Sequence, residues 1–71
     1  MSYAAYYKAA RENIERHLGD VITSDMLDPD SEAGMDDFYE EVYVLAHDGA
    51  VNAGAPMLLA QMIANEVKLE Y

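Results

Sequence analysis

The sequence predicts an all-α protein, a small three-helix bundle that forms a single domain over residues 1–71. Three stretches carry apolar residues at three- and four-residue steps, which is the spacing of one helix face. No stretch alternates apolar and polar residues as a half-buried strand does, and no segment repeats. Glycine and proline fall near the ends of these stretches, where helices stop.

The first helix is expected over residues 2–18. Ser2 can cap its start, and Gly19 is expected to end it at the C′ position. Glu12 and Arg16, four residues apart, should form a supporting ion pair on the opposite, mixed-sign face. The apolar face comprises Tyr3, Tyr7, Ala10, Ile14 and either His17 or Leu18, and we expect its tyrosines to be packing residues.

An acidic connector follows over residues 20–34, in which the segment TSDML can form one capped helical turn before Asp28 and Pro29 interrupt it. The second helix is expected over residues 35–53, and Asp30 or Ser31 can cap a turn that enters it. Gly49 costs up to about 1 kcal/mol inside a helix, so a break there is the alternative. The apolar face of this helix comprises Met35, Phe38, Val42, Leu45, Ala46, Gly49 and Ala53.

The third helix is expected over residues 56–70, with Gly54 ending the second helix and Pro56 as its own first residue. Its predicted core stripe is Leu59, Met62, Ile63 and Val67. Leu58 and Leu69 widen the apolar surface beyond what one neighbouring helix would cover. A chain of 71 residues buries only about 60% of its unfolded surface. With no cysteine for a disulfide or zinc site, self-association is a natural remedy, and we expect a candidate homodimer interface at Leu58, Met62 and Leu69.

The charge of the chain is concentrated in one segment. The formal net charge is −10, and residues 17–67 contain eleven acids but no lysine or arginine. Such a segment repels phosphate and anionic lipid, so we expect neither direct nucleic-acid binding nor membrane binding. A basic protein is the complementary partner.

The stretch DPDSEAGMDDFYEE, residues 28–41, holds seven of these acids. Asp36 and Asp37 near the predicted start of the second helix interact favourably with its dipole. Glu40, Glu41 and Asp48 lie further along, and acids four apart repel one another by a few tenths of a kcal/mol. Their presence therefore indicates a role other than monomer stability. The predicted partner-binding residues are Asp28, Asp30, Glu32, Asp36, Asp37, Tyr39, Glu40, Glu41, Tyr43 and Asp48.

These acids predict a protein-binding module that imitates the charge of a nucleic acid. Asp36 with Glu40, and Asp37 with Glu41, place carboxylates about 5–6 Å apart on a rigid helix, of the same order as phosphate spacing. Tyr39 and Tyr43, between the apolar stripe and the acidic face, are residues of the type enriched at interfaces. Small acidic proteins of phages and mobile elements, such as anti-CRISPR, anti-restriction and glycosylase inhibitors, block nucleic-acid enzymes in this way. This analogy rests on charge and size alone.

Three alternatives stay open. In the first, the protein is a structural or regulatory homodimer with an apolar interface, and its acids serve solubility. In the second, the acidity and the low lysine content reflect a salty cytoplasm, although the balanced first helix argues against a uniform acidic coat. In the third, a carboxylate loop using Asp28, Asp30, Glu32 and Asp36 binds calcium. The EF-hand register fails because Ala33 holds the glycine position and Tyr39 the glutamate position.

The sequence contains no catalytic signature, so we expect a protein that is not an enzyme and needs no cofactor or metal. His17 and His47 lack a metal-ligand spacing, and no glycine-rich phosphate loop is present. Neighbouring helical residues point about 100° apart, so His47 and Asp48 are expected not to form a compact pair. The first residues lack a basic region followed by an apolar run, and no apolar run is long enough to span a membrane. We therefore expect a cytoplasmic location, which is the host cytoplasm if a phage encodes the protein.

Overall fold

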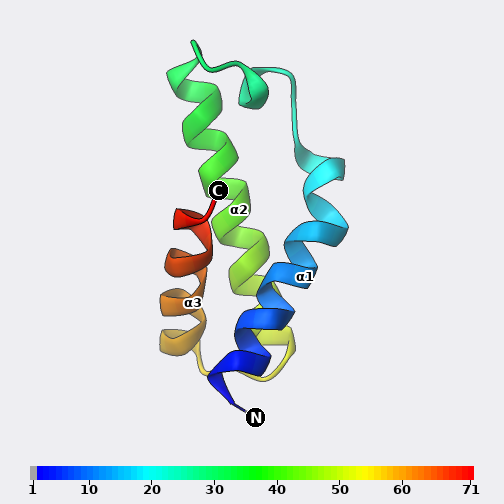
Figure 1. The fold of residues 1–71 in the computed structure, drawn as a ribbon, viewed down its shortest axis with the longest axis vertical. Coiled ribbons are helices and arrows are strands. Elements are labelled where there is room, and N and C mark those ends of the chain that lie inside the picture. Colours follow the sequence, from blue (N-terminus) through cyan, green and yellow to red (C-terminus); the bar gives the residue numbers. More distant parts are fainter. Residues whose placement is uncertain (1) are drawn as a thin grey trace.

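The computed structural model describes residues 2–71 and confirms an all-α three-helix bundle (Figure 1). Helix α1 spans Tyr3–Val21, α2 spans Glu32–Asn52 and α3 spans Met57–Leu69, with a short 3₁₀ helix, η1, at Asp25–Leu27 between α1 and α2. This 3₁₀ helix is the turn predicted at TSDML. The described residues contain helices, turns and irregular connections but no strand.

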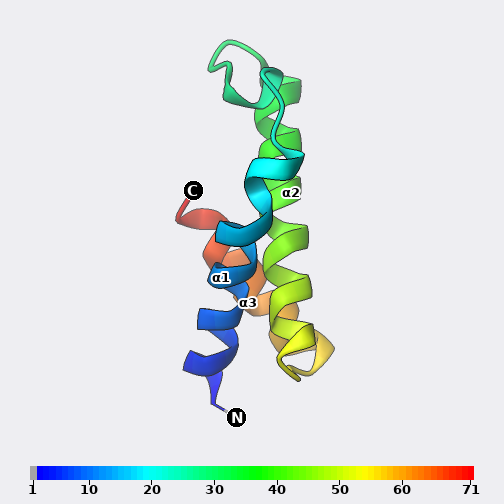
Figure 2. The same ribbon diagram turned by 90° about the vertical axis from the view of Figure 1, so that its right-hand side faces the viewer.

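The bundle is elongated, with extents of 40 × 19 × 16 Å. Helices α1 and α2 run antiparallel along most of the long axis, whereas α3 lies beside only the half of α2 that is farther from the connector (Figure 1). In Figure 2, α1 and α3 lie on the same side of α2. The other side of α2 is therefore left uncovered (Figure 2), and Asp36, Asp37, Glu40 and Asp48 of this helix are exposed.

The helix boundaries differ from the predicted ones by up to three residues. Ser2 caps α1 as predicted, since its Oγ accepts a hydrogen bond from the backbone N–H of Ala5. Gly19 does not end the helix: α1 continues to Val21 and stops where Ile22 turns extended while donating to the carbonyl of Leu18. A glycine can occupy a helical position, and here the following residues keep the helical hydrogen bonds.

Helix α2 begins at Glu32, three residues before the predicted start, because Ser31 is its cap. The Oγ of Ser31 accepts from the N–H of Gly34 at 3.1 Å. At the other end Gly54 has the left-handed φ of 104°, as predicted for a residue that ends a helix. Pro56 is the N-cap of α3, so α3 begins one residue later than predicted.

The core is built mainly from small side chains, which lets the three helices approach closely. Met62 was predicted to lie in the core stripe, and this is wrong: it is 58% exposed. Ala60 and Ala64 take that place because the side of α3 that meets α2 and α1 is centred on Ile63 and Val67. The buried apolar residues are Ala10, Ile14, Val42, Ala46, Ala50, Ala55, Ala60, Ile63, Ala64 and Val67.

Gly49 lies where α1 and α2 approach each other closely, and α2 does not break there. A Cβ at this position would lie 2.7 Å from the carbonyl oxygen of Ala9, 2.8 Å from the Cβ of Asn13 and 2.9 Å from the Cα of Ala10. Beside this crossing, the Nδ2 of Asn13 donates a 2.8 Å hydrogen bond to the carbonyl of Leu45. The absence of a side chain at Gly49 therefore sets the distance between the two helices.

Candidate functional site

The candidate site is the uncovered side of α2, where carboxylates gather along a rigid helix. Asp36, Asp37, Glu40 and Asp48 are exposed, and Glu41 is half-buried. Because residues four apart lie on the same helix face, Asp36 pairs with Glu40 along one flank and Asp37 with Glu41 along the other. These acids, four residues apart in the sequence, thus lie on one continuous helix.

The early start of α2 changes what its acids can contribute to stability. Glu32 is the acid of the first helical turn, where it interacts favourably with the helix dipole. Asp36 and Asp37 lie beyond that turn, so the predicted dipole benefit for them is wrong, since the effect fades within one turn. Fewer of the carboxylates on α2 are therefore explained by the stability of the helix itself.

The connector acids lie at one end of the molecule. Asp28, Asp30 and Glu32 are exposed, and the Asp28 carboxylate accepts a 2.9 Å hydrogen bond from the backbone N–H of Asp30, which tightens the turn. Among the residues whose side chains the structure describes, no group of three His, Cys, Asp or Glu side chains is arranged to hold a metal ion. The looser calcium arrangement considered from the sequence is accordingly not assembled.

Tyr39 and Tyr43 are half-buried at the edge of the acidic side, as predicted. They line a groove of about 460 Å³ between α2 and α3, together with Asp36, Glu40, Asn65 and Lys68. The Tyr39 ring packs edge-on against Phe38 with centroids 5.5 Å apart, and the Tyr43 ring stacks on His47 at 6.1 Å. Neighbouring rings thus hold both tyrosines in place. Lys68 and Asn65 were not predicted from the sequence, because only the packing of α3 brings them to this groove.

The remaining members of the predicted set are not in this groove. Asp37, Glu41 and Asp48 lie on the flank of α2 away from Tyr39 and Tyr43. The His47 Nδ1 lies 3.9 Å from the Asp48 Oδ1, which is too long for a hydrogen bond, so these neighbours form no compact pair. This distance lies at the outer limit for an ion pair.

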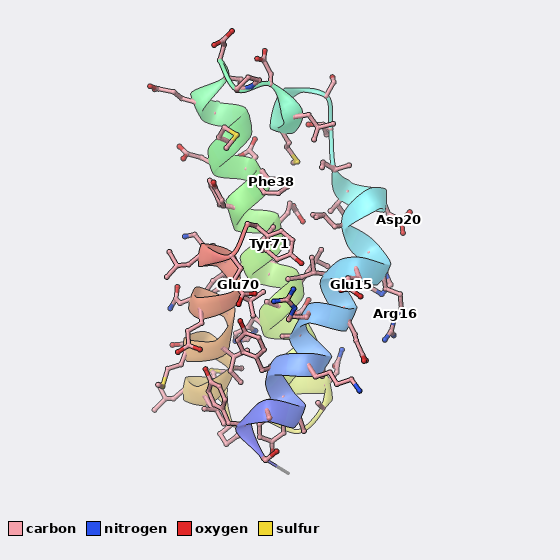
Figure 3. All side chains as sticks on the ribbon, in the orientation of Figure 1. Glu15, Arg16, Asp20, Phe38, Glu70 and Tyr71 are labelled. Atoms are coloured by element: carbon pink, nitrogen blue, oxygen red, sulfur yellow. The ribbon has the colours of Figure 1, made fainter. Side chains whose placement is uncertain are left out.

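The basic residues of α1 are engaged away from the uncovered side of α2. Lys8 and Arg16 each lie 3.9 Å from Glu12, which confirms the predicted pair of Glu12 with Arg16. Arg11 pairs with Glu70, the C-cap residue of α3. Arg16 and Asp20 point away from α2 on the outer side of α1 (Figure 3). Among the side chains that the structure describes, every ion pair formed by lysine or arginine thus joins an acid of α1 or the C-cap residue of α3.

A polar contact between α1 and α3 was also missed from the sequence. Tyr3 donates a hydrogen bond to Glu66, Tyr7 donates to Glu70, and Arg11 binds the same Glu70 carboxylate. Glu70 lies between α3 and α1 in Figure 3. The tyrosines are therefore more than packing residues. The available signal was the matching four-residue spacing of the two tyrosines and the two glutamates.

This contact changes the pKa values of its tyrosines. The hydrogen bond to Glu66 raises the pKa of Tyr3 to about 12, with smaller contributions from desolvation and from the Glu66 charge. The hydrogen bond to Glu70 likewise raises the pKa of Tyr7, while Arg11 opposes this shift. Deprotonating either tyrosine would place a second negative charge beside a carboxylate, so the contact requires neutral tyrosines.

The outer face of α3 is apolar. Leu58, Met62 and Leu69, the predicted interface residues, are 76%, 58% and 86% exposed, and Met57 beside them is 67% exposed. The structure thus places all three on the surface, where they are available for contact with another molecule.

Comparison of the chain with protein-family models, with curated proteins and with solved structures finds no match. No helix within residues 2–71 combines the length and the apolar character needed to cross a membrane. The acidic side of α2 and the apolar outer face of α3 are therefore the features from which a function can be inferred.

Proposed function

We propose that this protein is a non-enzymatic inhibitor that binds a basic, nucleic-acid-binding protein through the uncovered side of α2. The observation that carries the proposal is the row of carboxylates on α2. Among the described residues, no lysine or arginine forms an ion pair with these carboxylates. Neither the helix dipole nor ion pairing explains these acids, and like charges four apart cost stability. Binding to a basic surface would offset that cost.

The proposed mechanism is competition for a phosphate-binding site. Residues four apart on a helix have Cβ atoms about 5–6 Å apart, which is of the same order as the spacing of phosphates along a strand. The long-range field of the acidic side speeds the encounter with a basic partner, and aromatic contacts then slow dissociation. Tyr39 and Tyr43 are suited to supply these contacts because they are partly exposed and already held by neighbouring rings.

The biological setting that fits this mechanism is the inhibition of a defence enzyme by a phage or mobile element, of the anti-CRISPR type. The small size of the chain and its charge support this setting by analogy. In this proposal the protein acts in the cytoplasm of the host and contacts neither nucleic acid nor membrane directly.

Capture of partners on the immobilised protein tests the proposal. A double variant, Asp36→Asn with Glu40→Gln, removes two charges from the groove flank of α2. The matched control, Glu15→Gln with Asp20→Asn, removes two exposed charges from α1. We expect the wild type and the control to capture a basic protein, and an added DNA or RNA duplex to release it. The α2 variant should capture at least tenfold less of this protein. Equal capture by the α2 variant would refute the proposal.

Two further measurements separate this function from the alternatives. Mimicry predicts that capture weakens as salt rises from about 0.05 to 0.5 M, because exposed charges are screened over about 10 Å at 0.1 M. A halophilic origin of the acids instead predicts that the free protein unfolds at low salt and folds in molar potassium chloride. We expect a cooperative thermal transition at low salt.

A further inference from the structure

We infer that the groove between α2 and α3 binds one arginine side chain of the basic partner. This inference rests on the proposed function, because it takes the partner to be a basic protein, and it names the group of that partner which the groove recognises. The groove has a volume of about 460 Å³, which is ample for one long side chain. It is lined by Asp36, Tyr39, Glu40, Tyr43, Asn65 and Lys68.

Two acids and two tyrosines alternate on the α2 wall of this groove. Their positions follow the series i, i+3, i+4 and i+7, which places them on one continuous patch of the helix: Asp36, Tyr39, Glu40 and Tyr43. The rings of Phe38 and His47 pack against the two tyrosines and hold them in place. A ligand that enters the groove therefore meets aromatic rings and carboxylates together on a rigid helix.

The polar groups of this patch are not used within the fold. Among the described side chains, no hydrogen bond or ion pair involves any of the four. Lys68 lines the same groove, and yet the ion pairs of the described residues do not join it to Asp36 or Glu40. The two carboxylates and the two phenol groups are therefore available to a ligand.

The contact between α1 and α3 shows how the same kinds of group are satisfied elsewhere in this protein. There, Tyr7 donates a hydrogen bond to Glu70, and the guanidinium of Arg11 binds the same carboxylate. The groove likewise places tyrosines beside carboxylates, but among the described residues no arginine lines it. An arginine from another molecule would complete an equivalent set of contacts.

A guanidinium group is the cation that fits this combination of rings and carboxylates best. It is planar, so it stacks on an aromatic ring, and its five N–H groups form a fork that can bind carboxylates at the same time. An ammonium group is a compact and more strongly hydrated charge, and it offers no flat face to a ring. Arginine binds phosphate with the same fork, so an arginine held in the groove is withdrawn from the nucleic acid.

Lys68 opposes the entry of a cation, and this provides a test of the charge of the occupant. The groove contains two carboxylates but one ammonium group, and the chain as a whole has a formal net charge of −10. A cation is therefore favoured over an anion, although the ammonium group of Lys68 repels it. Removing that ammonium group should tighten the binding of a cation and weaken the binding of an anion.

Peptide binding to the full chain, followed by NMR spectroscopy of the backbone amides, tests the inference without the partner. The probe is acetyl-Gly-Arg-Gly-amide. One comparison peptide has lysine in place of arginine, which keeps the charge, and another has citrulline, which keeps the shape. A single side chain binds weakly, so each peptide is titrated to about 20 mM at constant ionic strength. We expect the amide shifts to concentrate at the groove, with an affinity for the arginine peptide about threefold above lysine and about tenfold above citrulline.

Variants of the groove test whether the named side chains carry this binding. Asp36→Asn with Glu40→Gln should weaken binding of the arginine peptide about tenfold, and Tyr43→Leu should weaken it about fivefold. The matched control Glu15→Gln with Asp20→Asn removes the same charge from exposed positions of α1 and should change the affinity by less than about twofold. Each variant should keep the helical circular dichroism spectrum of the wild type.

The Lys68→Met variant should bind the arginine peptide about twofold more tightly than the wild type. Weaker binding by this variant would indicate an anionic occupant and overturn the inference. Equal affinities for the arginine and lysine peptides, an absence of shifts at the groove, or unchanged binding by both groove variants would also overturn it.

The peptide titration and the capture of a partner can fail separately. Capture that depends on Asp36 and Glu40, without any preference for the arginine peptide, would leave the proposed function intact and refute the arginine site alone. Arginine binding in the groove, without capture of any basic protein, would refute the proposed inhibitor while the arginine site stands.

Discussion

Replacing Gly49 by alanine should destabilise the bundle, although alanine is the better helix former. The added Cβ would lie within 3 Å of three atoms of α1, two of which are backbone atoms of Ala9 and Ala10 that no side-chain rotation can move. Helix α1 would have to shift away from α2. That shift would stretch the 2.8 Å hydrogen bond from Asn13 to the carbonyl of Leu45.

The net cost follows from three contributions. Overpacking costs about 1–3 kcal/mol, and loss of the Asn13 hydrogen bond about 1 kcal/mol. The helix propensity of alanine returns up to about 1 kcal/mol. We expect a net loss of about 2 kcal/mol, which is substantial for a 71-residue domain whose total stability is about 4–10 kcal/mol. The corresponding decrease in melting temperature is about 8–16 °C.

Thermal unfolding followed by circular dichroism measures this decrease, and Gly19→Ala provides the matched control. A Cβ at Gly19 has no atom within 4 Å, so the same substitution there should add up to about 1 kcal/mol of stability. The two variants should therefore move the melting temperature in opposite directions. If Gly49→Ala melts at or above the temperature of wild type, the argument from close helix approach is wrong.

Three other variants test the remaining contacts. In urea unfolding, Ile63→Ala should lower the free energy of unfolding by about 2–5 kcal/mol. Met62→Ala, at an exposed position, should change it by less than about 0.5 kcal/mol. A large loss of stability in Met62→Ala would contradict the placement of Met62 on the surface. Ser31→Ala should cost about 1 kcal/mol by removing the cap of α2, and Ser31→Asn should restore most of it. Because folding raises the pKa of Tyr3, its contact stabilises the fold at pH values below the unfolded pKa of 10.0. This stabilisation is lost as the pH rises toward the folded pKa of about 12. The stability advantage of wild type over Tyr3→Phe should accordingly decline between pH 9 and 12, and a constant difference would exclude a contribution from the Glu66 contact.

The secondary structure was largely predictable because its signals are local. Ser2, the turn at residues 23–27 and Gly54 each act through backbone geometry within a few residues, and the structure has all three features as predicted. Gly19 and the start of α2 were misplaced by two or three residues. At those positions glycine and serine fit more than one place in a helix terminus, and neighbouring hydrogen bonds decide between them.

The composition of the core was less predictable. Met62 has the spacing and the apolar character of a core residue, and only the approach of α2 and α1 shows that Ala60 and Ala64 face inward instead. Periodicity identifies an apolar helix face, but α3 has two such faces. Which of them is buried depends on contacts between residues far apart in the sequence.

The candidate site likewise has some properties that follow from the sequence and others that depend on helix packing. The sequence by itself determined the charge: eleven acids and no lysine or arginine over residues 17–67, with carboxylates four apart along a predicted helix. It also determined the apolar character of Leu58, Met62 and Leu69. These properties belong to the residue types and to the helical period.

Only the tertiary structure decided which charges are engaged and which surfaces are left open. Glu66 and Glu70 meet Tyr3, Tyr7 and Arg11 because α3 folds back beside α1. Asp36, Asp37, Glu40 and Asp48 of α2 stay exposed because α1 and α3 pack on the other side of this helix (Figure 2). The physical reason is that helix packing depends on how closely two backbones can approach. That distance is set at Gly49 and at the core alanines by the absence of large side chains, which no single stretch of sequence reveals.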